Sequence, residues 1–212
     1  MPAAFPILRW VAAAWFAVWL PAYAHYWGWG NFVQICDIAV FLSLAGLWLG
    51  SSLLLSSQVV GLLVVTLFWV ADAGWRLLLG RHLIGGTEYL WDANFPLWLR
   101  LLSLYHIILP VVLLWSLRRV GFDARGWKLQ ALIAAAAMAA GRFFDPALNY
   151  NMAHRDPLFG REWSPAPVHV AFIWLVTVAV VYFPTHLLLK KIYQPAMSPA
   201  RERTADSSLR SE

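Results

Sequence analysis

Residues 57–79 read SQVVGLLVVTLFWVADAGWRLLL, and this stretch decides the class of the fold. Its only acidic or basic side chains are Asp72 and Arg76. A helix over these 23 residues would be about 34 Å long, which exceeds the roughly 30 Å hydrocarbon core of a bilayer. The stretch therefore predicts a transmembrane helix. Its two charges need a partner, a cavity or a function, because charged side chains are costly inside a membrane.

The composition of the whole chain favours the same class. Of its 212 residues, 61% are hydrophobic and 13% are charged, and the mean hydropathy is +0.61. Soluble domains are less apolar and carry more charge. The 14 Trp, 12 Phe and 7 Tyr residues exclude a disordered chain, and the single cysteine excludes a disulfide framework and any multi-cysteine zinc or iron–sulfur site. The composition therefore predicts an integral membrane protein.

Further apolar runs suited to membrane helices lie at 6–24, 31–54, 95–117, 127–144 and 167–189. The uncharged part of the run at 127–144 is short, because Lys128 lies at its start and Arg142 at its end. Both cations must therefore snorkel to the membrane interfaces. We predict an all-α fold, a polytopic membrane helix bundle of six transmembrane helices within residues 1–195. The polar residues 196–212 are predicted to be a disordered cytoplasmic tail. This division leaves no room for a separate catalytic domain.

The basic residues predict the orientation of the bundle. Residues 118–128 carry a net charge of +3 and residues 190–212 a net charge of +2, so these segments hold the whole excess of +5. The positive-inside rule places both segments in the cytoplasm, and with six spans both termini lie there too. This distribution also removes the case for a nucleic-acid partner. An alternative for the N-terminus is a signal peptide with Trp10–Leu20 as its apolar region and Ala22-Tyr23-Ala24 as its cleavage site.

Nearly all the polar side chains within the predicted helices fall in the outer half of the bilayer. Arg100, Ser103 and His106 lie within a stripe of about 120° on one helix, so they can face one cavity. We predict a cavity between the second, third and fourth helices that opens to the outer side and is capped by residues 145–169. Its candidate residues are Cys36, Asp37, Asp72, Arg76, Arg100 and His106 from the helices, with Asn149, His154 and His169 from the loops.

Several of these side chains also have a purely structural interpretation. Asp72 and Arg76 are four residues apart on a helix and would neutralise one another. Asp37 would pair with Arg100 or Arg142 and so hold helices together. A lone buried cysteine is usually a small hydrophobic residue. These interpretations stay open beside the functional ones.

His106 is the strongest single candidate, because an ionisable residue near the middle of a membrane is expected to be functional. No second deep histidine faces it in the outer half, so the sequence favours no haem, and we predict no cofactor. A metal site on the outer face is an alternative, with ligands drawn from His82, His154, His169, Asp145 and Asp156.

Four segments carry a resemblance to a known family: Gln34-Ile35-Cys36-Asp37-Ile38-Ala39, Leu67-Phe68-Trp69 with Ala73-Gly74, Phe95-Pro96 leading to Leu104-Tyr105-His106, and Asn149-Tyr150-Asn151-Met152 followed by Asp156-Pro157. In this order, over about residues 31–175, they resemble the YwaF-like bacterial integral membrane family. Its eukaryotic relatives include a Cys/His transmembrane acyltransferase that handles ether phospholipids. The family usually has a histidine just before the cysteine, where this chain has Gln34 and Ile35.

The resemblance implies a location in the bacterial cytoplasmic (inner) membrane and an acyl-transfer or lipid-hydrolysing activity. It implies that Cys36 accepts the acyl group and that His106 is its base, since an imidazole can generate the nucleophilic thiolate. Arg100 would then bind a lipid phosphate, and Asp37 would orient the imidazole or balance the arginine. The remaining candidates, Asp72, Arg76, Asn149, His154 and His169, would bind substrate.

The same cavity would equally serve a non-enzymatic membrane protein that binds a lipid or a small solute, or a subunit of a complex. A membrane lipid is the predicted partner in either case. Gly46 and Gly50, with Ser43 one turn before them, form a small-xxx-small pattern that would allow a homodimer or a membrane complex. A secondary transporter is a further alternative, although no internal repeat supports it.

Overall fold

The computed structural model describes residues 4–193, and every regular element in this range is helical. The prediction of an all-α fold is confirmed for this range, whereas the predicted tail at 196–212 lies outside the described residues. The main helices are α1 (Leu8–Trp27), α2 (Ile35–Leu49), α3 (Ser52–Leu79), α4 (Leu97–Leu102), α5 (Tyr105–Val120), α6 (Gly126–Gly141), α7 (Ala166–Thr177) and α8 (Phe183–Tyr193). The π-helical segment η4 (Val178–Tyr182) joins α7 to α8, and short 3-10 helices occur at η1 (Trp29–Val33), η2 (Glu88–Leu90) and η3 (Tyr150–Met152).

Three helical stretches are long and apolar enough to cross a membrane: Ser52–Leu79, Leu97–Val120 and Ala166–Tyr193. Each coincides with one of the predicted spans. The shorter α2 is also apolar, but it occupies only the middle of the predicted run at 31–54. Helix α2 ends before the end of that run, because Gly50 adopts a left-handed conformation. Ser51 then caps the next helix by accepting a hydrogen bond from the Leu54 N–H.

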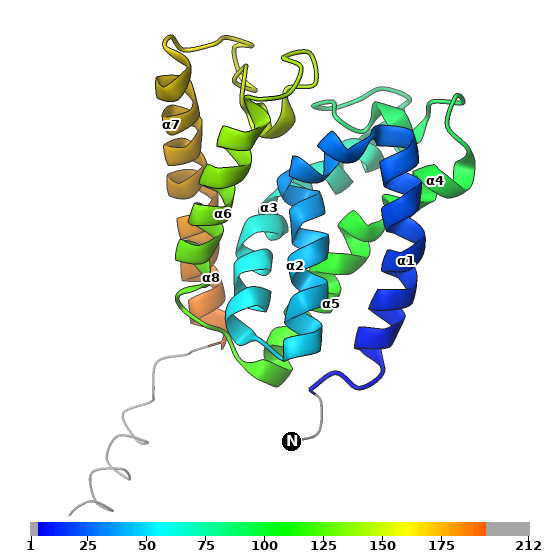
Figure 1. Ribbon diagram of the computed structural model, residues 1–212, viewed down its shortest axis with the longest axis vertical. Helices are drawn as coiled ribbons and strands as arrows, with labels where there is room; N and C mark the ends of the chain where they lie inside the picture. Colours follow the sequence, from blue (N-terminus) through cyan, green and yellow to red (C-terminus); the bar gives the residue numbers. More distant parts are fainter. Residues whose placement is uncertain (1–3, 194–212) are drawn as a thin grey trace, which may run out of the picture.

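Helix α3 lies at the centre of the bundle and packs against α2, α5 and α6 (Figure 1). Its first half is buried, and residues such as Leu55, Val59 and Leu62 form a core with Leu113 of α5 and Tyr182 of η4. The outward faces of the helices carry large exposed apolar side chains, including Leu78, Ile108, Leu132 and Leu175. Large exposed apolar side chains on several helices are typical of a surface that faces lipid.

The connections alternate between the two ends of the bundle (Figure 1). The segment before α1, the link between α5 and α6 and the end of α8 lie at one end, whereas the loops after α3 and α6 lie at the other. The first end carries the basic cluster at 118–128. The chain therefore passes along the bundle an even number of times between its described ends.

Candidate functional site

A cavity of about 320 Å³ is lined by residues of α1, α2, α3 and α5 and by residues of the 80–94 loop. Its polar lining consists of Asn31, Gln34, Cys36, Asp37 and His106. Its aromatic lining consists of Tyr23, Trp27, Trp69, Tyr89 and Tyr105, and Val65 and Gly86 complete the walls. A cavity of this size holds a small ligand or the head group of a larger one. The structure thus brings the candidate residues Cys36, Asp37 and His106 together.

Asp37 lies in the first turn of α2 and is only 1% exposed. Its carboxylate accepts hydrogen bonds from the Asn31 side-chain amide at 2.5 Å and from the Tyr105 hydroxyl at 2.8 Å. The Gln34 amide in turn donates to Asn31 Oδ1 at 2.7 Å and holds that side chain in place. The predicted pairing of Asp37 with Arg100 or Arg142 is wrong, because these donors are neutral and both arginines bind elsewhere. Within residues 4–193, no Lys or Arg side chain pairs with this carboxyl group, which lies at the N-terminal end of the α2 dipole.

His106 is buried at the start of α5, where its ring stacks on the rings of Trp69 and Tyr105. Its Nδ1 lies 2.8 Å from the Ser103 carbonyl oxygen. Because a carbonyl can only accept, Nδ1 carries the proton and Nε2 of the neutral ring is an acceptor. Within residues 4–193, Nε2 has no hydrogen-bond partner. The ring is therefore fixed in orientation and holds a free base in the wall of the cavity.

Cys36 lines the same cavity and is partly exposed. A reactive cysteine is usually activated by a neighbouring lysine, arginine or protonated histidine. The described residues that line this cavity include neither lysine nor arginine, and Asp37 follows Cys36 directly. These surroundings favour the neutral thiol over the thiolate.

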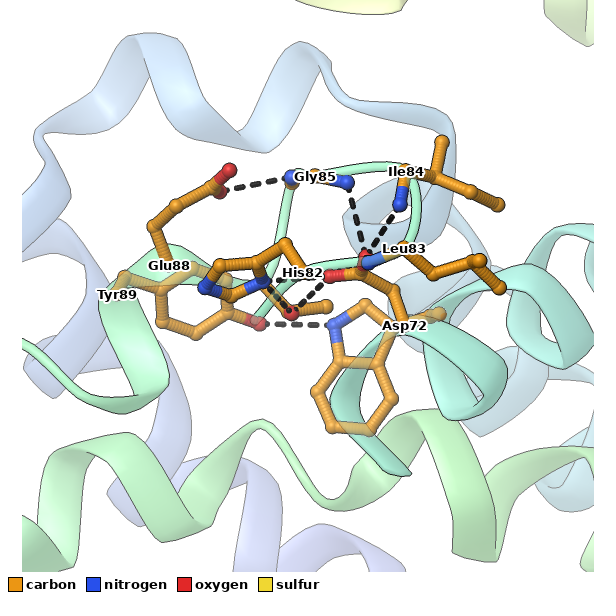
Figure 2. A network of polar contacts seen from close by, with 10 residues as sticks. Asp72, His82, Leu83, Ile84, Gly85, Glu88 and Tyr89 are labelled. Carbon is orange, nitrogen blue, oxygen red and sulfur yellow. Dashed lines mark hydrogen bonds and ion pairs between the residues drawn. The ribbon is translucent and has the colours of Figure 1, made fainter. Parts of the chain in front are cut away.

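Asp72 has a structural role that differs from the predicted one (Figure 2). Its Oδ1 accepts hydrogen bonds from the backbone N–H groups of Leu83, Ile84 and Gly85 at 2.8, 2.7 and 2.9 Å. Its Oδ2 contacts the Thr87 hydroxyl and lies 2.9 Å from His82 Nδ1. The prediction that Asp72 and Arg76 neutralise one another is wrong, because the loop saturates the carboxylate. The Arg76 guanidinium instead lies over the Trp91 ring, 6.0 Å from its centroid.

The loop that Asp72 holds forms one wall of the cavity. Gly85 and Gly86 both have positive φ, a conformation that permits the tight turn around the carboxylate, and Gly86 lines the cavity. Tyr89 also lines it and accepts a hydrogen bond from Trp69 Nε1 at 3.0 Å. Burial raises the pKa of Tyr89 to about 12, so its hydroxyl stays protonated. Arg100 braces the loop by donating to the Leu90 carbonyl at 2.9 Å.

The loop between α6 and α7 does not supply the predicted cap. Asn149 Oδ1 accepts from the N–H groups of His154 and Arg155, and His169 bridges the Trp163 N–H and the Met152 carbonyl. These bonds fold the loop on itself, and none of Asn149, His154 and His169 lines the cavity. The same holds for Asp72, Arg76 and Arg100, so six of the predicted substrate-binding residues are supports or lie elsewhere.

Charged residues near the same loop are also paired or satisfied locally. Arg142 forms an ion pair with Glu162 at 2.7 Å and donates to the Ala153 carbonyl. Backbone N–H groups, led by that of Phe159, hold the pKa of the Asp156 carboxyl below its usual range. Within residues 4–193, no three His, Cys, Asp or Glu side chains are grouped so that they could hold a metal ion. The alternative of an outer metal site therefore has no geometric support in this range.

A second, apolar groove of about 290 Å³ adjoins the cavity between α1, α2, α4 and α5. Three residues of its rim, Val11, Leu101 and Ile108, are 59%, 50% and 60% exposed, so the groove opens on the outside of the bundle. The Ser43 hydroxyl lies in its wall and has no hydrogen-bond partner in the described part of the chain. Tyr105 lines both the groove and the cavity, so its side chain is a wall that the two spaces share.

Sequence reasoning missed the residues that hold or surround Asp37. Asn31 and Tyr105 donate to its carboxylate, and Tyr23, Trp69 and Tyr89 supply aromatic walls. A polar residue next to an apolar run, such as Asn31, was one available signal. Tyr105 directly precedes His106, but its partner Asp37 is 68 positions away and could not be found by local pattern.

No protein-family model, curated protein or solved structure matches this chain.

Proposed function

We propose that this protein binds a membrane lipid or a similar amphiphile, with the polar head group of the ligand in the cavity and its apolar acyl chain in the groove. The observation that carries the proposal is that a polar cavity and an apolar groove lie on either side of one shared wall residue, Tyr105. A polar space beside an apolar one matches the two chemical parts of an amphiphile. The rim of the groove opens on the lipid-facing exterior, so an acyl chain can enter sideways from the bilayer.

We further propose that the chain crosses the bacterial cytoplasmic membrane six times, with both termini in the cytoplasm. The even number of passes and the basic cluster at one end support this orientation. The cavity would then lie in the outer half of the bilayer. We expect Leu158→Cys, in a Cys36→Ser background, to react with a membrane-impermeant maleimide in intact cells. Arg119→Cys should react only after the cells are opened, and labelling of both before opening would contradict the orientation.

Lipid binding is tested by native mass spectrometry of the purified protein with an added phospholipid. Val11 lies on the exposed rim of the groove, so Val11→Trp fills its mouth without burying new polar atoms. We expect this change to lower the bound fraction at least about 5-fold, which corresponds to about 1 kcal/mol of lost apolar contact. The control is Leu132→Trp, because Leu132 is equally exposed but lies on α6 away from the groove. Equal lipid retention by both variants would contradict the proposal that the acyl chain of the lipid lies in the groove.

A second candidate function is acyl transfer on Cys36, as the resemblance to the YwaF-like family implies. The observation in its favour is the free Nε2 of His106 in the wall that Cys36 also lines. His106 would take the thiol proton, the sulfur would attack the ester carbonyl, and the lysolipid would leave with that proton. Cys36 would be left as a thioester.

The same spectra, recorded after denaturation, distinguish the two functions. An acyl-transfer enzyme should show a hydroxylamine-sensitive mass increase that is lost in Cys36→Ser and in His106→Gln. A binding protein should show lipid only under native conditions, and Cys36→Ser should retain it. If the Cys36→Ser variant shows the same mass increase as the unchanged protein, Cys36 is excluded as the acyl acceptor.

A further inference from the structure

The walls of the cavity are unusually rich in aromatic rings. Tyr23 and Trp27 come from α1, Trp69 from α3, Tyr89 from η2 and Tyr105 from α5. Trp27 and Tyr89 meet edge to face, with ring centroids 5.7 Å apart, and close one side of the space. Aromatic faces attract organic cations, and a ring of them is the usual means of binding a quaternary ammonium group.

The cavity also holds a buried carboxyl group, that of Asp37, which forms no ion pair with any described residue. The hydrogen-bond donors to Asp37 are the neutral side chains of Asn31 and Tyr105. The arginines that contact the loop have partners other than Asp37, since Arg100 donates to the Leu90 carbonyl and Arg76 lies over Trp91. A cation placed beside this carboxyl group would supply the missing opposite charge.

A metal ion does not suit this site. Calcium and magnesium need six or more oxygen ligands and favour carboxylates, and Asp37 is the one carboxylate among the described residues that line the cavity. An organic cation needs no such shell, because its charge is spread over methyl groups that pack against the aromatic faces. The size of the cavity, about 320 Å³, also accommodates a group larger than a bare ion.

The geometry points to a quaternary ammonium group as the ligand of this cavity, held between the Asp37 carboxylate and the aromatic walls. This inference rests on the proposed function, because it names the chemistry of the head that the cavity receives. The group belongs either to a choline lipid or to a free choline-like solute.

The requirement for a positive charge on the ligand is tested with two small molecules of the same shape. Choline and 3,3-dimethylbutan-1-ol differ at one atom, nitrogen in the first and carbon in the second, so that only choline is charged. We expect choline to raise the melting temperature of the detergent-solubilised protein and the alcohol to leave it unchanged. For the lipid source, phosphatidylcholine should outcompete phosphatidylglycerol of the same chains in native mass spectra.

Variants locate the interaction. Asp37→Asn should weaken choline or phosphatidylcholine binding at least about 10-fold, and Tyr89→Leu about 3-fold or more, the scale of one cation–π contact. Asp92→Asn is the matched control, because Asp92 is a carboxylate near the same loop that does not line the cavity. If Asp37→Asn fails to fold, the comparison of the two probes on the unchanged protein still decides the question.

The possible results distinguish a failure of this inference from a failure of the proposed amphiphile binding. Binding of choline alone, or of phosphatidylcholine alone, supports the inference and identifies the source. Equal binding of the charged and neutral probes, or of the two lipids, overturns the inference and leaves amphiphile binding intact. Absence of binding of every lipid and solute overturns both.

Discussion

Replacing Asp72 by alanine is expected to release the 81–87 loop and to lower the free energy of unfolding by about 3 kcal/mol or more. The change removes an acceptor that serves three backbone N–H groups, the Thr87 hydroxyl and His82 (Figure 2). All five donors lose this shared acceptor together, and the Thr87 hydroxyl, which is only 1% exposed, loses it in a buried position, where an unmade hydrogen bond costs most. Asp72→Asn keeps one acceptor oxygen and should have an intermediate effect.

Hydrogen–deuterium exchange measures the release directly. The amides of Leu83, Ile84 and Gly85 should exchange roughly 100-fold faster in Asp72→Ala, because each factor of ten corresponds to about 1.4 kcal/mol. The control is Glu88→Gln, which alters an exposed carboxylate that accepts a single bond from the Gly86 N–H. It should change stability by less than about 0.5 kcal/mol. Unchanged protection of the three amides in Asp72→Ala would show that something else holds the loop.

The same variant should impair the candidate site. Gly86 of the released 81–87 segment lines the cavity, and Tyr89, two residues beyond that segment, lines it too, so the release loosens one wall. Ligand binding should therefore fall together with the protection of the loop amides, although Asp72 itself does not line the cavity.

Replacing Gly126 by alanine is expected to destabilise the bundle by about 1–3 kcal/mol. Gly126 begins α6 at a close approach to α3, where a β-carbon would lie 2.8 Å from Ser56 Cβ and 2.9 Å from the Ser57 backbone nitrogen. Backbone atoms in the central helix cannot move aside as the end of a flexible side chain can. The clash should separate α6 from α3.

Gly74→Ala is the matched control for this substitution. Gly74 lies in the interior of α3, and a β-carbon there meets no atom within 4 Å. Alanine favours helix over glycine by about 0.5–1 kcal/mol, so this change should be neutral or stabilising. Unfolding by sodium dodecyl sulfate in mixed micelles measures both variants. Effects of the same sign would contradict the packing described for Gly126.

Much of the fold could be predicted because the signal is local. A membrane helix needs about 20 apolar residues in succession, and this property can be read within one run such as 57–79. The early end of the run at 31–54 also has a local cause, the Gly50-Ser51 pair, which the apolar length concealed. The predicted position within the bilayer likewise identified Cys36, Asp37 and His106 as candidates, because polar residues inside an apolar run are few.

The sequence by itself determined the class of the chain, the approximate place of each helix and the three polar residues that meet in the cavity. Only the tertiary structure decided the partners of the charges. Asp72 has Arg76 one turn away, yet it binds residues 82–87 of the loop, because the turn at Gly85-Gly86 aims several N–H groups at one oxygen. Asp37 is held by Tyr105 of another helix. Such partners depend on how loops close and helices pack, and the spacing of residues along one helix does not encode them.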